Sequence, residues 1–542
     1  MASYGIALDL GTSGFRSHLA DLDKDGKILS TAVTVRHPLP GANIMDHLHF
    51  WMTSGSEIGH RIIMKTIDDL IRLHGCDNVA NIKKISICGN PIQLSLFENI
   101  EVRDLAFAGE NRLKSLGVVR PSRKAHTRKA GDIGVLSIDS EAEVLIPPAI
   151  RHEIGADALA MIMRSGMLDK KEVCMVTDYG TNAEMGLYHD GELYSGSAAA
   201  GPAMEGQSIK YGVLASPGAI SDVNISDDGR LWDNMVLNDT LMPVVAAKVD
   251  PATGKEIRIL DYKAKGITGT GVVSSMAMGL KSGVISLPHI DTGDKKVHLM
   301  DGVWFSEKDV QEAGKAMGAI RAGHRTLVRE VGIDDEEIKV MYMAGASGTY
   351  VDPIKAQICG MIPRRLDEVY QLGNTSLMMA LDLLRDDKML DRMQDVANSI
   401  SSNHIMFAGN PIFEDMYILE LAYWTEGMPM EMYNEMIQMS GIPSLPEIKI
   451  PSKVVRVVKS DIPDIGKGYY SLENVGMKMH ANFSGCTGCR KCEKGCPEKA
   501  LTVSKTKEIC VRSDLCLGTA CKACEMNCPE KVFKFTDLKV SL

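Results

Sequence analysis

The sequence predicts an α/β protein in which a duplicated pair of domains is followed by a small, cysteine-rich α+β tail. The turn sequence Asp-x-Gly-Thr occurs twice, at Asp9 and Asp178, each time between the first two strands of a predicted β-meander. Eight closely spaced cysteines lie between residues 486 and 528. Residues 441–470 contain four prolines and separate the two parts. One Asp-x-Gly-Thr turn alone would be weak evidence, but two in equivalent places predict a duplication.

Composition sets the class of protein and the number of domains. The chain has 542 residues, of which 45% are hydrophobic and 24% charged, as in soluble proteins with several cores. No uncharged apolar run is long enough to span a membrane, and the N-terminus lacks the features of a signal peptide. We therefore expect a cytoplasmic protein that does not associate with membranes. The predicted division is 1–150 and 151–440 for the two paired domains, 441–480 for a linker, and 481–542 for the tail.

The charge is distributed unevenly along the chain. Its net charge is −10, yet residues 481–542 carry 11 Lys and Arg against 7 Asp and Glu. Such a basic excess beside the eight closely spaced cysteines would offset the negative charge of an anionic group held by their thiolates. Because the rest of the chain is acidic and has no basic stripe, we expect no nucleic-acid partner.

The two meanders follow one plan. In each, an apolar strand leads into a Gly-Thr turn, and an Asp-Gly turn leads from the second strand into the third. The predicted strands are Tyr4–Leu10, Phe15–Leu22 and Ile28–Val35 in the first copy, and Val173–Thr177, Glu184–His189 and Glu192–Ser197 in the second.

The repeated turns have the chemistry of a phosphate site. Backbone N–H groups in such a turn can point at phosphate oxygens, and glycine lets the main chain approach closely. Asp9 and Asp178 would hold a hydrated Mg²⁺ or orient the attacking water. The remaining residues expected to contact phosphate are Gly11, Thr12, Ser13, Gly180, Thr181 and Asn182. A plain hairpin is the simpler interpretation of either turn alone, and no G-x-x-x-x-G-K-[ST] loop occurs.

A third element has the pattern of an adenosine loop. Ser306 is a predicted helix N-cap with Asp309 as its partner, and the strand Ile338–Met343 follows that helix. The strand leads into a turn of small residues, Gly345, Ala346, Ser347 and Gly348. From the residues alone, an adenosine loop and an ordinary strand–helix turn are equally good interpretations.

The eight cysteines fall into two runs that each end in Cys-Pro. The runs are Cys486-x2-Cys489-x2-Cys492-x3-Cys496 and Cys516-x4-Cys521-x2-Cys524-x3-Cys528. They resemble the bacterial iron–sulfur run, in which the fourth cysteine ligates the other cluster. This predicts one [4Fe–4S] cluster on Cys486, Cys489, Cys492 and Cys528, and a second on Cys516, Cys521, Cys524 and Cys496. The x4 spacing departs from the pattern. Zinc knuckles and disulfides are the alternatives, and two Cys-Pro endings and a reducing compartment argue against them.

Together these motifs resemble a known superfamily and one family within it. Two phosphate hairpins and a late glycine-rich loop resemble the actin-like (ribonuclease H-like) ATPases, and the tail resembles a ferredoxin. Residues 199–206 (AAGPAMEG) resemble the Ala-Ala-Gly-Pro-Ala-Phe-Glu-Gly signature of the corrinoid-protein reductive activators, with Met204 in place of Phe. Residues 360–363 (GMIP) are a weaker match. The chain departs from the bacterial activators in lacking their N-terminal [2Fe–2S] domain, and it resembles the archaeal branch that acts on methylamine methyltransferase corrinoid proteins.

The resemblance implies an ATP-dependent oxidoreductase that restores corrinoid cobalt from Co(II) to Co(I). It implies two [4Fe–4S] clusters, ATP and Mg²⁺ as cofactors, and corrinoid proteins and an upstream low-potential electron donor as partners. The alternatives are an activator or maturation factor of another redox metalloenzyme in methanogenesis, a small-molecule kinase, and a non-enzymatic assembly protein.

Several other features have two interpretations. Residues 85–92 and 405–412 share Gly-Asn-Pro-Ile, which we interpret as a duplicated strand end rather than a pair of loops facing the corrin. His37, His47 and His49 lack metal-ligand spacing, so we expect ordinary histidines. Cys510 precedes the second run and is expected to bind no cluster. The scattered cysteines of the body are Cys76, Cys88, Cys174 and Cys359, all expected to be core residues.

Overall fold

The computed structural model divides the chain into two compact units. It describes residues 3–41, 43–75, 81–107, 110–134, 137–150, 154–180, 182–201, 203, 208–213, 215–239, 241–401, 403–518 and 521–540. The first unit comprises Met1–Ala160, Ser376–Asn398 and Asp464–Leu542, and the second comprises Met161–Thr375 and Ser399–Pro463. The units do not follow the chain order of the predicted domains, because residues 376–398 and the tail both belong to the first unit.

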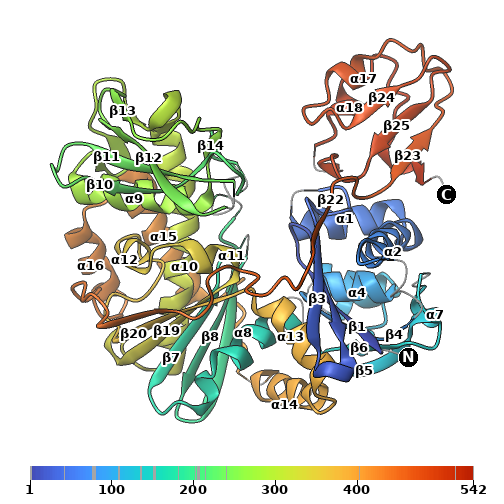
Figure 1. Ribbon diagram of the computed structural model, residues 1–542. Coiled ribbons are helices and arrows are strands. Elements are labelled where there is room, and N and C mark those ends of the chain that lie inside the picture. The colour runs from blue at the N-terminus through green and yellow to red at the C-terminus, as the bar shows by residue number, and fades with distance from the viewer. Residues whose placement is uncertain are drawn as a thin grey trace. The chain divides into compact units, whose positions relative to one another are not determined.

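A seven-stranded sheet is the centre of the first unit, in the order β22-β3-β2-β1-β4-β6-β5 (Figure 1). The central strand β1 is apolar and buried, as expected for a strand in the middle of a covered sheet. It pairs antiparallel with β2 and parallel with β4. The strands are β1 (Tyr4–Leu10), β2 (Phe15–Asp21), β3 (Lys27–Thr34), β4 (Ile82–Gly89), β5 (His126–Lys129), β6 (Glu143–Ile146) and β22 (Tyr469–Leu472).

Helices cover both faces of this sheet. Figure 1 shows α13 on the other side of the sheet from α2 and α4. α13 packs closely on the sheet, since a Cβ on Gly5 would lie 2.9 Å from Leu384. The helices with all or part of their length in this unit are α1 (Ile44–Ser54), α2 (Ser56–Leu73), α4 (Pro91–Glu98), α5 (Arg103–Ala106), α6 (Glu110–Ser115), α7 (Ala130–Ile133), α8 (Ala156–Ser165), α13 (Thr375–Arg385) and α14 (Met389–Ser401).

The second unit repeats the strand plan of the first. Its six-stranded sheet has the order β21-β20-β19-β7-β8-β9, with β19 parallel to β7 as β4 is to β1. The strands are β7 (Val173–Asp178), β8 (Ala183–His189), β9 (Glu192–Ala198), β19 (Ile338–Ala344), β20 (Glu368–Gly373) and β21 (Lys453–Arg456). The six predicted meander strands are thus confirmed to within one residue at each end.

A five-stranded sheet, β13-β12-β11-β10-β14, also belongs to the second unit. Its strands are β10 (Ala219–Ile225), β11 (Trp232–Leu237), β12 (Pro243–Val249), β13 (Glu256–Arg258) and β14 (Gly266–Ile267). Two short hairpins accompany it: β15 (Ile285–Ser286) with β16 (His289–Ile290), and β17 (Lys296–His298) with β18 (Trp304–Ser306).

Helices of different lengths complete the second unit. They are α9 (Gly269–Ser282), α10 (Glu307–Val331), α11 (Gly345–Tyr350), α12 (Pro353–Ile358), α15 (Pro411–Glu426) and α16 (Met430–Met439). The predicted cap of α10 is confirmed, because Ser306 and Asp309 form a capping box. Glycine lets α10 approach α15 closely, since a Cβ on Gly314 would lie 2.7 Å from Trp424 Cβ.

The tail is a small sheet with two short helices. Its strand order is β24-β25-β23-β26, with β23 (Lys478–Ala481), β24 (Leu501–Val503), β25 (Ile509–Arg512) and β26 (Lys539–Val540). The helices are α17 (Lys491–Lys494) and α18 (Ala523–Met526). Between body and tail, the segment predicted as a linker contains β21, parallel to β20, and β22, parallel to β3.

Gly-Asn-Pro begins a helix in both of its copies. Asn90 and Asn410 are the N-caps of α4 and α15, each with proline in the first turn. The first copy follows strand β4, as predicted. The second copy does not follow a regular strand, so the interpretation as a duplicated strand end is wrong for residues 405–408.

Candidate functional site

The first Asp-x-Gly-Thr turn joins β1 to β2 and is held by side chains around it. Asp9 is buried and accepts a hydrogen bond from Arg16 Nη1 at 3.2 Å. Gly11 is required by the tightness of the turn, since a Cβ there would lie 2.8 Å from the carbonyl oxygen of Gly14. Asn90 Nδ2 donates to Thr12 Oγ1 at 3.2 Å. The first Gly-Asn-Pro loop therefore belongs to this candidate phosphate site, a role that the sequence pattern did not reveal. Ser13 is exposed on the same turn.

The second Asp-x-Gly-Thr turn follows β7. Tyr179 is buried, and its hydroxyl donates to the carbonyl oxygen of Met361 at 3.0 Å. The N–H of Gly180 donates to the carbonyl oxygen of Asn182 at 3.2 Å and closes the turn. Thr181 lies outside the described residues. The turn is thus tied to the Gly-Met-Ile-Pro segment, which the sequence showed only as a weak resemblance.

The candidate adenosine segment meets this second turn. Gly345 has φ of +76°, and the space that a Cβ would occupy there is filled by the Asp178 carboxylate. A Cβ on Gly348 would lie 3.2 Å from the Tyr179 ring. The structure therefore brings together two elements that are far apart in the sequence, Asp178 and Tyr179 on one side and Gly345 and Gly348 on the other.

The segment after β19 is a helix rather than an open turn. Gly345–Tyr350 forms α11, which includes Ser347 and the backbone of Ala346. The side chain of Ala346 is not among the described ones. Buried Gln371 satisfies the end of this helix: its Nε2 donates to the carbonyl oxygens of Gly348, Thr349 and Val351 at 2.8, 3.0 and 2.9 Å. The expected small-residue turn is corrected to a short helix, because a distant glutamine satisfies its carbonyls.

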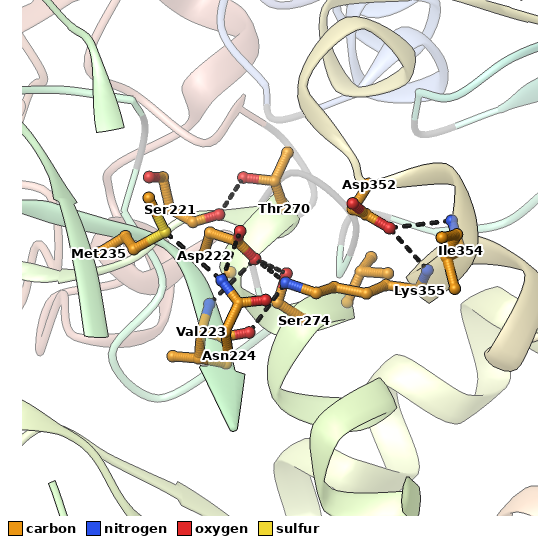
Figure 2. A network of polar contacts seen from close by, with 12 residues as sticks. Ser221, Asp222, Val223, Asn224, Met235, Thr270, Ser274, Asp352, Ile354 and Lys355 are labelled. Atoms are coloured by element: carbon orange, nitrogen blue, oxygen red, sulfur yellow. Dashed lines mark hydrogen bonds and ion pairs between the residues drawn. The ribbon is translucent and has the colours of Figure 1, made fainter. Parts of the chain in front are cut away.

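A polar network lies immediately beyond α11 (Figure 2). Lys355, on α12, is buried, and its Nζ pairs with the Asp222 carboxylate and donates to the carbonyl oxygen of Val223 at 2.8 Å. Ser274 on α9 also donates to Asp222, and Asp352 caps α12 through the N–H groups of residues 354 and 355. The network joins α9, α12 and β10, so the start of α12 is fixed to the five-stranded sheet.

A second buried network supports the Gly-Met-Ile-Pro segment. Arg321 and Glu420 form a two-point ion pair, with Nε–Oε1 and Nη2–Oε2 distances of 2.7 and 2.6 Å. Tyr433 Oη and Trp424 Nε1 donate to the same carboxylate at 2.5 and 3.1 Å. Burial by itself lowers the pKa of Arg321, but the attraction of Glu420 outweighs it and raises the pKa above its ordinary value. Gly360, at φ +72°, leaves room for this guanidinium.

The signature segment 199–206 is described only in part. Ala199, Ala200, Gly201 and Ala203 lie after β9, and residues 202 and 204–207 lie outside the described residues. Two of the three histidines noted in the sequence pack against each other. His37 and His47 are buried and stacked 3.8 Å apart, with Gln93 hydrogen-bonded to both, whereas His49 is exposed.

The eight tail cysteines gather around two cavities. One is lined by Cys486, Cys489, Cys492 and Cys528, together with Val503, Ile509 and Phe533. The other is lined by Cys496, Cys516, Cys521 and Cys524, together with Leu501, Val511 and Phe535. We call them cavity A and cavity B. Cys510 lines neither; its Sγ lies 3.9 Å from His480 Nε2.

The donor set of each cavity fits an iron–sulfur cluster. Four thiols surround each apolar space, and each contains the crossed-over fourth cysteine that the spacing predicts. Within the described residues, no His, Cys, Asp or Glu side chains converge on a single metal ion. A [4Fe–4S] cluster differs from a single ion because its four ligands bind four separate iron corners. Burial raises the pKa of the Cys516 and Cys524 thiols to about 12, so the positive charge of iron is what would make these thiolates stable.

The tail is fixed, on the side of cavity B, to the rest of the first unit, which we call the body. The N–H of Gly41 donates to the carbonyl oxygen of Cys516 at 2.9 Å, and Ser513 Oγ donates to that of Pro38 at 2.7 Å. The rings of Phe50 and Phe535 pack edge to face at 6.2 Å. These contacts set the orientation of the tail within the first unit.

Two family models match the chain in succession. Residues 4–170 match the RACo middle region, and residues 172–434 match the C-terminal domain of RACo, the ASKHA domain. Within the part of the chain that the structure describes, no helix is both long and apolar enough to cross a membrane.

Individual relatives agree with these models. The chain is 45% identical over 543 residues, 99% of both chains, to the Co(II) methylated amine-specific corrinoid protein reductase of Methanosarcina barkeri. It is 24% identical to Corrinoid activation enzyme RamQ of Eubacterium limosum, over 78% of this chain and 70% of that one. A solved structure of a reductive activator for corrinoid, iron-sulfur protein superposes with a TM-score of 0.62 at 22% identity, covering 77% of this chain and 66% of the other. The predicted fold class, a duplicated actin-like pair with a small ferredoxin-like tail, is confirmed.

Proposed function

Because this chain belongs to the family of corrinoid-protein reductive activators, we propose that it returns protein-bound cobalt from Co(II) to Co(I) in an ATP-dependent reaction. The observation that carries the proposal is that one chain holds two cavities, each with four cysteines, and two phosphate-type turns. An ATPase without a redox role has no use for eight such thiols. A carrier of electrons alone has no use for the turns.

The nucleotide is assigned to the repeated turns and to α11. Asp9 and Asp178 act on the hydrated Mg²⁺ and the attacking water. Backbone N–H groups of the turns, at residues 11–13 and 180–182, bind phosphate. Residues 345–348 bind adenosine. The contact between Gly345 and Asp178 supports this assignment, because a change at the nucleotide would reach both elements together.

The eight cysteines would hold two [4Fe–4S] clusters, which supply low-potential one-electron transfer when bound. The chain itself provides the thiolates, the apolar lining that excludes water, and the hydrogen bonds that fix the tail to the body. The proposed client is a corrinoid protein of a methylamine methyltransferase system. This is supported by the 45% identical relative, whose name specifies a methylated-amine corrinoid protein.

The free energy available from a conformational change is large enough to shift a one-electron reduction potential measurably. Co(I) is strongly reducing, so one-electron reduction of Co(II) is uphill for most donors. Coupling of about 1–3 kcal/mol between two sites shifts a one-electron potential by roughly 40–130 mV, because 59 mV corresponds to a factor of ten. A nucleotide-dependent change that alters the ligands of cobalt would supply a shift of this order.

One assay tests the proposal and separates it from its rivals. ATP hydrolysis and Co(I) absorbance are followed together, anaerobically, with titanium(III) citrate as the source of electrons, with and without Co(II) corrinoid protein. We expect corrinoid protein to stimulate hydrolysis and Co(I) to appear only with ATP. Equal cobalt reduction without ATP would refute the proposal. Phosphorylation of an added sugar or acid would indicate a kinase, and absence of hydrolysis under all conditions would indicate an assembly protein.

A further inference from the structure

The two cavities of the tail differ in what surrounds them. The side of cavity B contacts the body through Cys516, Ser513 and Phe535. The residues that line cavity A make no hydrogen bond to the body among the described contacts, and Cys489 is exposed there. A second protein can therefore approach cavity A from solvent without displacing a contact between the tail and the body.

Charge is also divided unevenly between the two cavities. Six exposed basic side chains lie in residues 490–494, 505–508 and 530–532, three segments that contain or adjoin residues lining cavity A. We call them the basic face, and they are Arg490, Lys491, Lys494, Lys505, Lys507 and Lys531. Arg490 lines the cavity, and the stem of Lys507 passes 3.3 Å from the Cβ position of Gly488. Three acidic residues share these segments: Glu493, Glu508 and Glu530.

The rest of the tail has almost no excess charge. It carries five basic residues against four acidic ones between positions 481 and 542. Two cysteine-ligated clusters of one kind would need equal charge compensation. The excess of positive charge beside cavity A is therefore larger than is needed to offset the negative charge of one cluster. An exposed excess of this kind is typical of a protein-binding surface.

The short helices of the tail show the difference at equivalent positions. α17 reads Lys-Cys-Glu-Lys and α18 reads Ala-Cys-Glu-Met. Both begin after a basic residue in the left-handed conformation, Arg490 and Lys522, and both place a cysteine second. Only the outer positions differ: two lysines beside cavity A are replaced by Ala523 and Met526 beside cavity B.

We propose that the basic face is the docking surface for a small acidic electron-carrier protein. The inference rests on the proposed function, because only a redox tail needs a donor. In the encounter the carrier is oxidised by one electron and the tail is reduced by one, and no bond forms. Complementary charge would bring the acidic carrier to the exposed edge at Cys489 and raise the association rate. Salt would weaken the encounter, because the charges are exposed.

The test uses the full-length protein with an iron–sulfur cluster bound at each of the two cysteine sets. The probe is an acidic clostridial-type ferredoxin. In the variant Lys491→Ala/Lys494→Met, α17 acquires the sequence of α18. Exposed ion pairs are each worth a few tenths to about 1 kcal/mol, so the dissociation constant for ferredoxin should rise roughly two- to thirty-fold at low salt. The difference from wild type should disappear at high salt. The matched variant Ala523→Lys/Met526→Lys should change the constant less than about two-fold.

Two further measurements keep the docking proposal and the proposed function apart. With titanium(III) citrate as reductant, Lys491→Ala/Lys494→Met should reduce cobalt as wild type does; with reduced ferredoxin it should be slower. Lys507→Glu should show the same pattern, which protects against a folding defect in α17. Unchanged ferredoxin affinity in both variants would overturn the docking proposal, as would binding of RNA but not ferredoxin at matched salt. Failure of wild type with titanium(III) citrate and ATP would instead refute the proposed function.

Discussion

Replacing Glu420 with glutamine should destabilise the second unit strongly. The substitution keeps the shape of the side chain and removes its charge. Arg321, whose side chain is 5% exposed, is then left charged without a counter-ion. Removing one partner of a buried ion pair typically costs about 3–5 kcal/mol of unfolding free energy, because the remaining charge stays desolvated. Tyr433 and Trp424 donate to different carboxylate oxygens, so the single oxygen of glutamine keeps an acceptor for only one of them. The loss therefore reports on the charge together with one hydrogen bond, and the double variant described next separates the two.

Urea denaturation followed by tryptophan fluorescence measures the effect. Glu336→Gln is the matched control, since Glu336 pairs with Arg365 at 2.7 Å while both side chains are exposed. That change should cost less than about 1 kcal/mol. The double variant Arg321→Met/Glu420→Gln removes both charges and should recover at least about 1 kcal/mol relative to Glu420→Gln.

Two results would refute this reasoning. One is a loss for Glu420→Gln no larger than that for Glu336→Gln. The other is a double variant less stable than Glu420→Gln, which would mean that packing and hydrogen bonds, rather than an uncompensated charge, determine the cost.

Two further predictions concern a turn and a pH range. Gly345→Ala should lose about 1–3 kcal/mol more unfolding free energy than Gly283→Ala, because both glycines have positive φ but only Gly345 contacts Asp178. Gly345→Ala should also lose ATPase activity. Equal losses of the two variants on urea denaturation would contradict a role for the contact with Asp178. Burial lowers the pKa of His18 and His74 to about 4, so both are neutral when folded. The first unit should therefore be fully stable above pH 6.5 and lose up to about 3 kcal/mol per histidine as pH falls from 6.5 to 4; pH-independent stability across that range would rule this out.

The local parts of the structure could be predicted from the sequence. The capping box of Ser306 and Asp309 depends on residues three apart, and the meander strands follow from alternation and Asp-Gly turns. The first three cysteines of each run are also marked by short spacings. Each of these signals is complete within a few neighbouring residues, so no knowledge of the tertiary fold is needed. The exchange of the fourth cysteine between the runs is instead implied by the resemblance to the bacterial iron–sulfur run.

The contacts that shape the candidate site are long-range and could not be predicted. Gln371 ends α11 from 20 or more residues away, and it turns an expected loop into a helix. Lys355 meets Asp222 across 133 positions, and Gly41 meets Cys516 only because the tail folds back on the first unit. A single sequence contains no local pattern for such pairs, because the partners share no periodicity and no spacing.

The central claim is that ATP use and the tail cysteines act together on corrinoid cobalt, and one measurement tests it most directly. Co(I) formation is followed in a single turnover with titanium(III) citrate and ATP, using wild type, Cys528→Ser and Cys510→Ser, with a reaction lacking the protein as the blank. Cys528 lines cavity A and Cys510 lines neither cavity. We expect wild type and Cys510→Ser to form Co(I) only with ATP, and Cys528→Ser to form it at least about tenfold more slowly while still hydrolysing ATP. Co(I) formation by Cys528→Ser at the wild-type rate, or by wild type without ATP, would contradict the claim.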